Sequence, residues 1–171
     1  MMRKLTLPEY YTADVRTLDY QAFYDAGYRV LLFDLDNTLL PWNVYDADED
    51  TIAFGKKLEE MGFKVAIVSN NNGDRVRRIA RAMELPYVPK ALKPLPMGFK
   101  KGVELFGLPK KQVLILGDQF YTDMFGGFFA GITRVYVEPL SASAYGWTNF
   151  VHDVEKGLRK KARLRPNRPQ K

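Results

Sequence analysis

The sequence contains no cysteine and a single histidine, His152, and these two scarcities exclude several kinds of site. Without cysteine the chain cannot form disulfides or thiolate metal sites, and nothing in it indicates an oxidising compartment. Zinc in proteins is bound mainly by cysteine and histidine, so a zinc site is not expected.

Long hydrophobic runs are also missing. The longest, such as Val30–Phe33 and residues 65–68, are far shorter than the roughly 20 apolar residues that a membrane-spanning helix needs. The N-terminus lacks the apolar stretch that follows the basic residues of a signal peptide. The chain is 171 residues long and 46% hydrophobic, which fits one globular domain with a buried core. We expect a cytoplasmic protein.

Acidic residues are absent from positions 156–171, which hold eight basic residues. The other 155 residues carry 18 basic and 20 acidic groups, so the formal net charge of +6 resides in this tail. One interpretation is a solvated, frayed terminus. The other is contact with an anionic surface, either a membrane or a nucleic acid.

Five short apolar segments alternate with four helical patterns. The segments, most of them nearly continuous aliphatic runs, are residues 29–33, 64–68, 87–88, 113–116 and 133–137. The helical patterns are residues 50–61, 74–83, 97–106 and 121–130. This alternation predicts a three-layer, Rossmann-like α/β fold: a five-stranded parallel sheet, buried on both faces by helices, with right-handed crossovers. We place this domain at residues 29–155, after an N-terminal helical extension (1–28) and before the basic tail (156–171).

Polar side chains follow each of the first four predicted strands. They are Asp34, Asp36, Ser69, Asn70, Lys93, Asp118 and Asp123. Ligands of open parallel sheets bind at the carboxyl ends of the strands, so these side chains are expected to converge on one crevice.

The chemistry of these residue types favours phosphoryl transfer. Asp34 and Asp36 are two apart at a strand end and face the same way. Clustered carboxylates repel one another unless a cation lies between them, and with Asp118 as a third oxygen ligand the set suits Mg²⁺. Lys93 adds a positive charge for phosphate oxygens, while Ser69 and Asn70 add hydrogen-bond donors. Each motif alone is also typical of a turn, a helix cap or a plain surface residue. Their joint occurrence after four successive strands favours a site.

In this arrangement the sequence resembles the haloacid dehalogenase (HAD) superfamily of aspartyl phosphatases. The matching residues are the segment Asp34-Leu35-Asp36-Asn37-Thr38, then Ser69, Lys93, and Asp118 with Asp123. In finer detail it is similar to the subfamily IIIA, YqeG-like phosphatases, a group that includes phosphatidylglycerophosphatases. The resemblance implies a HAD-like fold and a Mg²⁺-dependent phosphoric monoester hydrolase.

The resemblance also implies residue roles. Asp34 would attack phosphorus and become an aspartyl phosphate, and Asp36 would act first as acid and then as base. Ser69 would bind a phosphate oxygen, and Lys93 would hold both the nucleophile and the phosphate. Mg²⁺ would be bound by the Asp34 carboxylate, the Asp36 backbone carbonyl and Asp118, with Asp123 as a further carboxylate.

The spacing of the motifs bears on the substrate. Only 32 residues separate Asp36 from Ser69, and only 23 separate Ser69 from Lys93, so neither gap has room for a cap domain. We expect an open site with residues 39–48 as a short flap, on which Trp42 and Tyr45 either pack locally or contact substrate. An open site admits a phosphate displayed on something large. Together with the basic tail and the resemblance, it predicts a membrane lipid phosphate such as phosphatidylglycerophosphate. The tail would contact an anionic membrane peripherally, and nucleic acid is not the expected partner.

Three alternatives stay open at this point. The phosphate could belong to a protein, a nucleic-acid end or a sugar. A signalling receiver domain also combines clustered aspartates, Mg²⁺ and a lysine, but it has no acid equivalent to Asp36. A non-catalytic scaffold would need none of these side chains.

Overall fold

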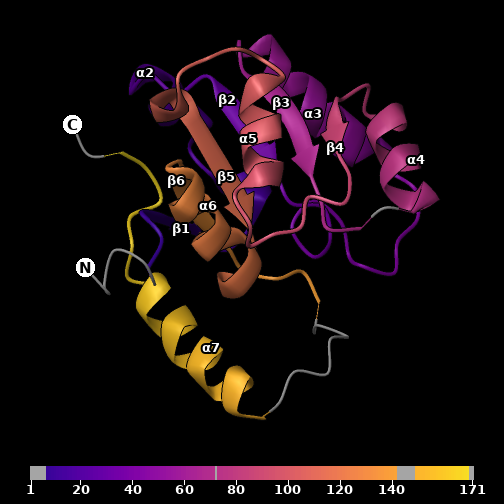
Figure 1. The fold of residues 1–171 in the computed structure, drawn as a ribbon. Helices are drawn as coiled ribbons and strands as arrows, with labels where there is room; N and C mark the ends of the chain where they lie inside the picture. The colour runs from indigo at the N-terminus through magenta and orange to yellow at the C-terminus, as the bar shows by residue number, and fades with distance from the viewer. Residues whose placement is uncertain (1–6, 72, 142–148, 170–171) are drawn as a thin grey trace.

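The computed structural model describes residues 7–71, 73–141 and 149–169, with the backbone alone for residues 149–155. Its centre is one sheet of six parallel strands in the order β1-β6-β5-β2-β3-β4 (Figure 1). The strands are β1 (Tyr10–Thr12), β2 (Val30–Phe33), β3 (Lys64–Val68), β4 (Tyr87–Val88), β5 (Val113–Gly117) and β6 (Thr133–Val137). The predicted parallel α/β architecture is confirmed.

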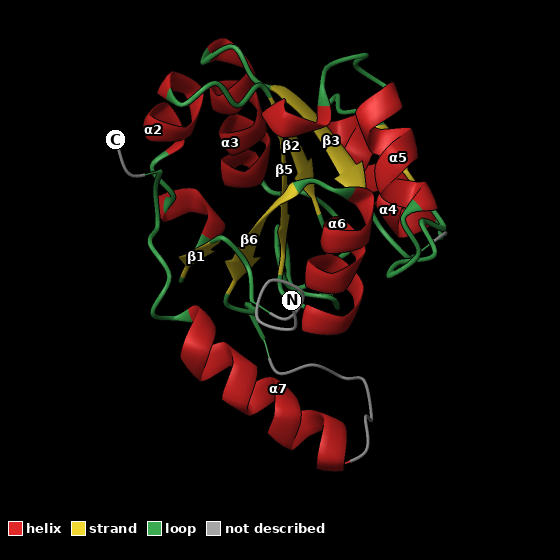
Figure 2. Cartoon of the chain, turned by 60° about the vertical axis from the view of Figure 1, so that its left-hand side comes forward, coloured by secondary structure: helices red, strands yellow, loops and turns green. Residues whose placement is uncertain are grey.

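Helices cover both faces of the sheet. They are α2 (Tyr20–Asp25), α3 (Glu49–Glu60), α4 (Asp74–Ala82), α5 (Met97–Glu104), α6 (Phe125–Ala130) and α7 (Asn149–Ala162). Figure 2 shows α2 and α3 on one side of the sheet and α5 and α6 on the other. Short 3-10 turns lie at Val15–Thr17 and Lys110–Gln112, and one π-helical turn lies at Phe120–Met124.

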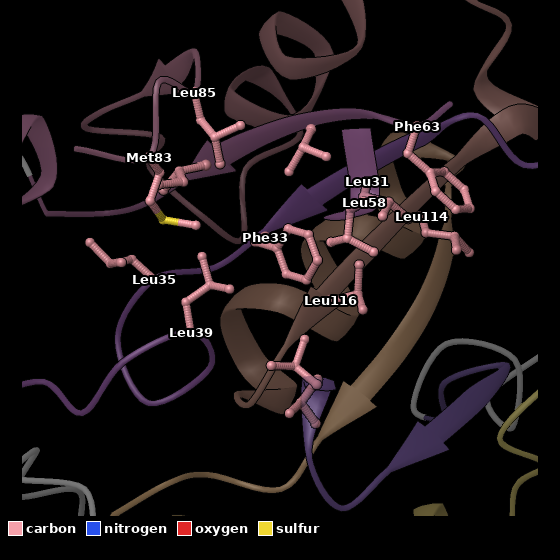
Figure 3. Close-up of a cluster of buried hydrophobic side chains, with 14 of the residues drawn as sticks. Leu31, Phe33, Leu35, Leu39, Leu58, Phe63, Met83, Leu85, Leu114 and Leu116 are labelled. Atoms are coloured by element: carbon pink, nitrogen blue, oxygen red, sulfur yellow. The ribbon is translucent and has the colours of Figure 1, made fainter. Parts of the chain in front are cut away.

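The alternation of side chains along the strands explains this layering, because successive residues of a strand point to opposite faces. Leu31 and Phe33 of β2 belong to the hydrophobic cluster formed with α2, α3 and α4 (Figure 3). Val30 and Leu32 of the same strand belong to the cluster formed with α5 and α6. Since β2 is buried on both faces, its continuous aliphatic sequence is what a central parallel strand requires.

The prediction of five strands is wrong, because β1 is a sixth. It pairs in parallel with β6 at the sheet edge, Tyr10 opposite Val135. The strand has only three residues and no aliphatic run, so no periodicity marks it. Contacts beside it hold it in place: the buried guanidinium of Arg134 donates to the Leu7 carbonyl and to the Glu9 carboxylate. Residues 7–28 therefore combine α2 and a 3-10 turn with a strand of the sheet. The boundaries at residues 28 and 155 stay predictions.

The described part of the basic tail is packed on the domain. Ala162 of α7 is fully buried in a cluster with Phe120, Met124 and Tyr136. The backbone N–H of Tyr11 donates to the Pro166 carbonyl, 3.1 Å away, and Arg163 pairs with Glu138. The frayed terminus is thus not what the structure shows for residues 156–169. No helix in the described parts of the chain is both long and apolar enough to cross a membrane.

Candidate active site

The predicted site residues meet at the carboxyl ends of the central strands. A cleft of about 360 Å³ lies there, lined by Asp34, Asp36, Asn70, Asn71, Lys93, Gln119, Tyr121 and Thr122. A larger hollow of about 980 Å³ lies between α2 and residues 166–169, and none of the predicted site residues lines it. The smaller cleft is the one that the predicted site residues line.

Lys93 is the positive centre of this site. Its Nζ donates to Asp34 Oδ1 at 2.5 Å and to Asp123 Oδ1 at 2.6 Å, and all three side chains are buried. Burial opposes a charged lysine, but the carboxylates of Asp123 and Asp34 outweigh it and raise the pKa of Lys93 above its ordinary value. Lys93 is therefore a cation fixed against the predicted nucleophile.

Asp34, Asp118 and Asp123 form a buried carboxylate cluster. One oxygen from each lies within 4.8 Å of the others. Burial raises the pKa of Asp34 to about 7, with Asp123 adding to the rise and Lys93 opposing it. Burial and the two neighbouring carboxylates also raise the pKa of Asp118 well above its usual range. A second positive charge beside Lys93 would relieve this repulsion, and three oxygen donors so close together fit a hard divalent cation.

Asp36 lines the same cleft and is paired with an arginine. Arg75, at the start of α4, donates from Nη1 to Asp36 Oδ1. Its Nε donates to the Val44 carbonyl at 2.6 Å and its Nη2 to the Pro41 carbonyl at 2.9 Å. One buried guanidinium thus joins Asp36 to the flap at residues 39–48. Burial raises the pKa of Asp36, although Arg75 opposes the rise. The predicted metal contact through the Asp36 carbonyl stays a prediction.

Ser69 and Asn70 form the turn that follows β3. The Asn70 side chain is bonded twice to Lys93: Nδ2 donates to the Lys93 carbonyl at 3.0 Å, and Oδ1 accepts from the Lys93 N–H at 2.7 Å. Ser69 is fully buried, and its Oγ accepts from the Asn71 N–H at 3.0 Å. Asn70 therefore fixes the backbone of Lys93. The predicted phosphate contacts of Ser69 and Asn70 stay predictions.

Two contributors were missed at the sequence level, Arg75 and Gly117. A signal for Arg75 existed, since it lies four residues before Ile79 and so on the buried face of α4. From the sequence alone, Gly117, which precedes Asp118, is indistinguishable from an ordinary turn residue. In the structure, a Cβ atom on Gly117 would lie 2.4 Å from Cγ of Asp123. Asp123, on the π-helical turn, reaches Lys93 only because position 117 has no side chain.

Gly117→Ala is expected to lower phosphatase turnover by about a hundredfold, since displacing a catalytic group by about 1 Å has an effect of that order. The methyl group would push the Asp123 carboxylate, and with it Lys93, out of position. Gly157→Ala is the matched control, because a Cβ there meets nothing within 4 Å. Steady-state kinetics and thermal melting of both variants check this. A Gly117→Ala protein with wild-type turnover and melting temperature would show that the close contact between position 117 and Asp123 does not affect activity.

Comparison with known proteins identifies the family of the chain. The haloacid dehalogenase-like hydrolase family matches residues 42–131. The chain is 31% identical over 158 residues to the probable phosphatase YqeG of Bacillus subtilis, covering 92% of each chain. It is 30% identical over 150 residues to phosphatidylglycerophosphate phosphatase 1, chloroplastic, of Chlamydomonas reinhardtii, covering 82% of this chain and 56% of that one. Among solved structures, the cobalt-bound deoxy-D-mannose-octulosonate 8-phosphate phosphatase of Haemophilus influenzae aligns with a TM-score of 0.50. That alignment covers 65% of this chain and 68% of the other at 15% identity, which bears on the fold alone.

The chain belongs to the haloacid dehalogenase-like hydrolases. Within that family it is a phosphatase, with a buried group of three aspartates that can hold a metal ion.

Proposed function

We propose that this phosphatase hydrolyses a phosphomonoester through an aspartyl phosphate on Asp34, with Mg²⁺ at the carboxylate cluster. The observation that carries the proposal is the placement of Asp34. Its carboxylate lines the cleft, is bonded to the buried Lys93 ammonium and lies beside Asp118 and Asp123. Mg²⁺ held by these three carboxylates would offset negative charge on the phosphate.

In the proposed first step, an Asp34 carboxylate oxygen forms a bond to phosphorus as the bond to the ester oxygen breaks. Asp36 gives its proton to the departing oxygen, so the alcohol leaves neutral. Burial raises the pKa of Asp36, which makes the proton that this role needs easier to hold than on an exposed aspartate. Arg75 holds the Asp36 side chain in one orientation through a hydrogen bond, and a second hydrogen bond from Arg75 holds the flap at Val44.

In the second step, water attacks phosphorus and Asp36 takes its proton. The bond between phosphorus and Asp34 breaks, and inorganic phosphate leaves. Lys93 remains paired with Asp34 and contributes positive charge to the phosphate throughout, held in place by Asn70. Ser69, at the base of the same turn, is the proposed donor to a phosphate oxygen.

The proposed substrate is a lipid-borne phosphate such as phosphatidylglycerophosphate. Three features support this. A relative covering most of this chain is named for that lipid. Only a loop lies between β2 and α3, and on its flap Trp42 is 44% exposed and Tyr45 61% exposed. Exposed lysines of α7, Lys156, Lys160 and Lys161, offer a peripheral contact for an anionic membrane.

A panel of phosphate esters in the presence of Mg²⁺ tests the substrate. It should contain phosphatidylglycerophosphate in detergent micelles, a phosphopeptide, a 5′-phosphorylated oligonucleotide, a sugar phosphate and 4-nitrophenyl phosphate. We expect the highest kcat/KM with the lipid. A soluble ester turned over faster than the lipid would reject the lipid assignment and leave the phosphatase assignment standing.

Removal of the metal is expected to lower turnover of 4-nitrophenyl phosphate by at least about a hundredfold, since charge-stabilising groups in active sites contribute on this scale. Dialysis against EDTA followed by assay measures this, and added Mg²⁺ should restore the rate. Dialysis without EDTA is the control. Full turnover in excess EDTA would contradict the role given to the carboxylate cluster.

A further inference from the structure

One side of the cleft carries exposed apolar side chains that the proposed chemistry does not use. Leu92, Leu95 and Met97, in the segment leading from β4 into α5, and Tyr121 and Phe129, in the segment leading from β5 through α6, are each between 49% and 57% exposed. We call these five residues the apolar rim. Such clustering is unusual for a water-facing surface, since contiguous exposed apolar patches commonly mark interaction sites.

The two segments of the rim are in contact with each other and with the cleft. The Pro94 carbonyl, between Leu92 and Leu95, lies 3.2 Å from the place that a Cβ on Gly126 of α6 would occupy. Lys93 and Tyr121 line the same cleft. Figures 1 and 2 agree in placing α5 and α6 next to each other on one face of the sheet. The rim therefore begins beside the phosphate site, at Tyr121 and the segment that carries Leu92, Leu95 and Met97, and extends along α6 to Phe129.

The exposed charge around the rim is mostly positive: three lysines outnumber the one exposed acid of α5, Glu104, which lies on the same helix face as Lys100. Residues 85–103 contain four lysines and no acid, and Lys90, Lys100 and Lys101 are exposed. Residues 119–133 contain one charged group, Asp123, which is buried against Lys93. Within the described residues, the three exposed lysines form no ion pair, and their charges face solvent. Lys100 and Lys101 follow Met97 by three and four residues on α5 and so lie beside it.

We propose that the apolar rim with Lys90, Lys100 and Lys101 docks on an anionic lipid bilayer, with the cleft opening toward the membrane surface. Apolar side chains flanked by a surplus of lysines over acids are the pattern of interfacial membrane contacts. Lysine can keep its ammonium among the headgroups while its stem lies along apolar surface. The cores of protein–protein interfaces are depleted in lysine, so the same composition fits a protein partner poorly.

This inference rests on the proposed function in one respect, because docking on the bilayer brings a lipid-borne phosphate to the cleft. The surface itself differs from the basic tail, because it lies on α5 and α6. It can be tested without turnover, so failure of one proposal does not imply failure of the other.

The test is co-sedimentation of the full chain with vesicles of phosphatidylcholine containing or lacking phosphatidylglycerol. The wild-type chain should bind the anionic vesicles and bind neutral ones at least tenfold more weakly. The combined variant Leu95→Asn, Met97→Gln should lose tenfold or more in affinity. Neither of these two side chains lines the cleft. Leu105→Asn, at the far end of α5 and 47% exposed, is the matched control and should bind as wild type.

The lysines are tested separately. Lys100→Gln with Lys101→Gln should lower the affinity for anionic vesicles by about fivefold for each lysine, as expected for charges near such a surface. Lys56→Gln with Lys57→Gln, two exposed lysines of α3 on the opposite face of the sheet, should have no comparable effect.

Three results would overturn the proposal. Two are equal binding of anionic vesicles by the wild type and the rim variant, and no binding by the wild type. The other is a concentration-dependent dimer in analytical ultracentrifugation that the rim variant abolishes, since the occupant of the rim would then be a second copy of the chain. Circular dichroism and melting of each variant ensure that a loss of binding is not a loss of fold.

Discussion

Asp34→Asn is expected to reduce hydrolysis of every phosphate ester by on the order of 10⁴-fold or more, because an amide oxygen cannot form the aspartyl phosphate. The fold should remain. Asparagine has the shape of aspartate, and its Oδ1 can still accept the hydrogen bond from Lys93. Burial raises the pKa of Asp34 to about 7, so its charge is less favourable in the folded state than in the unfolded state. Losing that charge should leave the melting temperature within a few degrees of wild type.

The matched control for this variant is Asp46→Asn. Asp46 lies in the loop after the same strand, but its side chain is 68% exposed and pairs with Arg78. Exposed pairs of this kind contribute about 0–1 kcal/mol, so the control should keep both its activity and its stability. Kinetics with 4-nitrophenyl phosphate, together with circular dichroism, give the comparison. A well-folded Asp34→Asn protein retaining a tenth of wild-type turnover would remove Asp34 from the role of nucleophile.

Asp36→Asn is expected to separate the two steps of the reaction. With an alkyl phosphate the first step should slow by about 10²–10⁴-fold, since the leaving alkoxide needs a proton. With 4-nitrophenyl phosphate the first step should be nearly unimpaired, because nitrophenolate is a stable anion. The second step needs a base for either substrate. The variant should therefore release one equivalent of nitrophenol per active site in a rapid burst and then nearly stop.

Stopped-flow absorbance measures the burst, and quenched-flow assay of an alkyl phosphate gives the comparison. Asp48→Asn is the control: Asp48 caps α3, accepts from the Thr51 N–H at 2.8 Å and should not change the leaving-group dependence. If Asp36→Asn slowed both substrates equally and gave no burst, Asp36 would not be the acid and base.

The strands could be located from the sequence because burial on both faces leaves a continuous aliphatic run. Val30–Phe33 and Lys64–Val68 are central strands of this kind, and both were found. Tyr10–Thr12 could not be found this way, because it is three residues long and held at the edge by long-range contacts of Arg134. Local patterns carry no information about such contacts.

The site was predictable where topology alone brings residues together. Strand ends meet at one edge of a parallel sheet, so Asp34, Lys93 and Asp118 converge whatever the details of their loops. Contacts that depend on the path of a loop could not be predicted. The bonds of Arg75 to the flap carbonyls and the pairing of Asn70 with the Lys93 backbone are of this type. The need for glycine at position 117 is visible only once Asp123 has been placed.

The most direct test of this account is to find where the phosphoryl group resides during turnover. The Asp36→Asn chain should be mixed with phosphorus-32-labelled 4-nitrophenyl phosphate and Mg²⁺, then quenched in acid and digested. Its peptides should then be mapped. The account predicts stoichiometric label, sensitive to alkali as an acyl phosphate is, on the peptide that contains Asp34. Turnover without any covalent label, or label on a different residue, would contradict it.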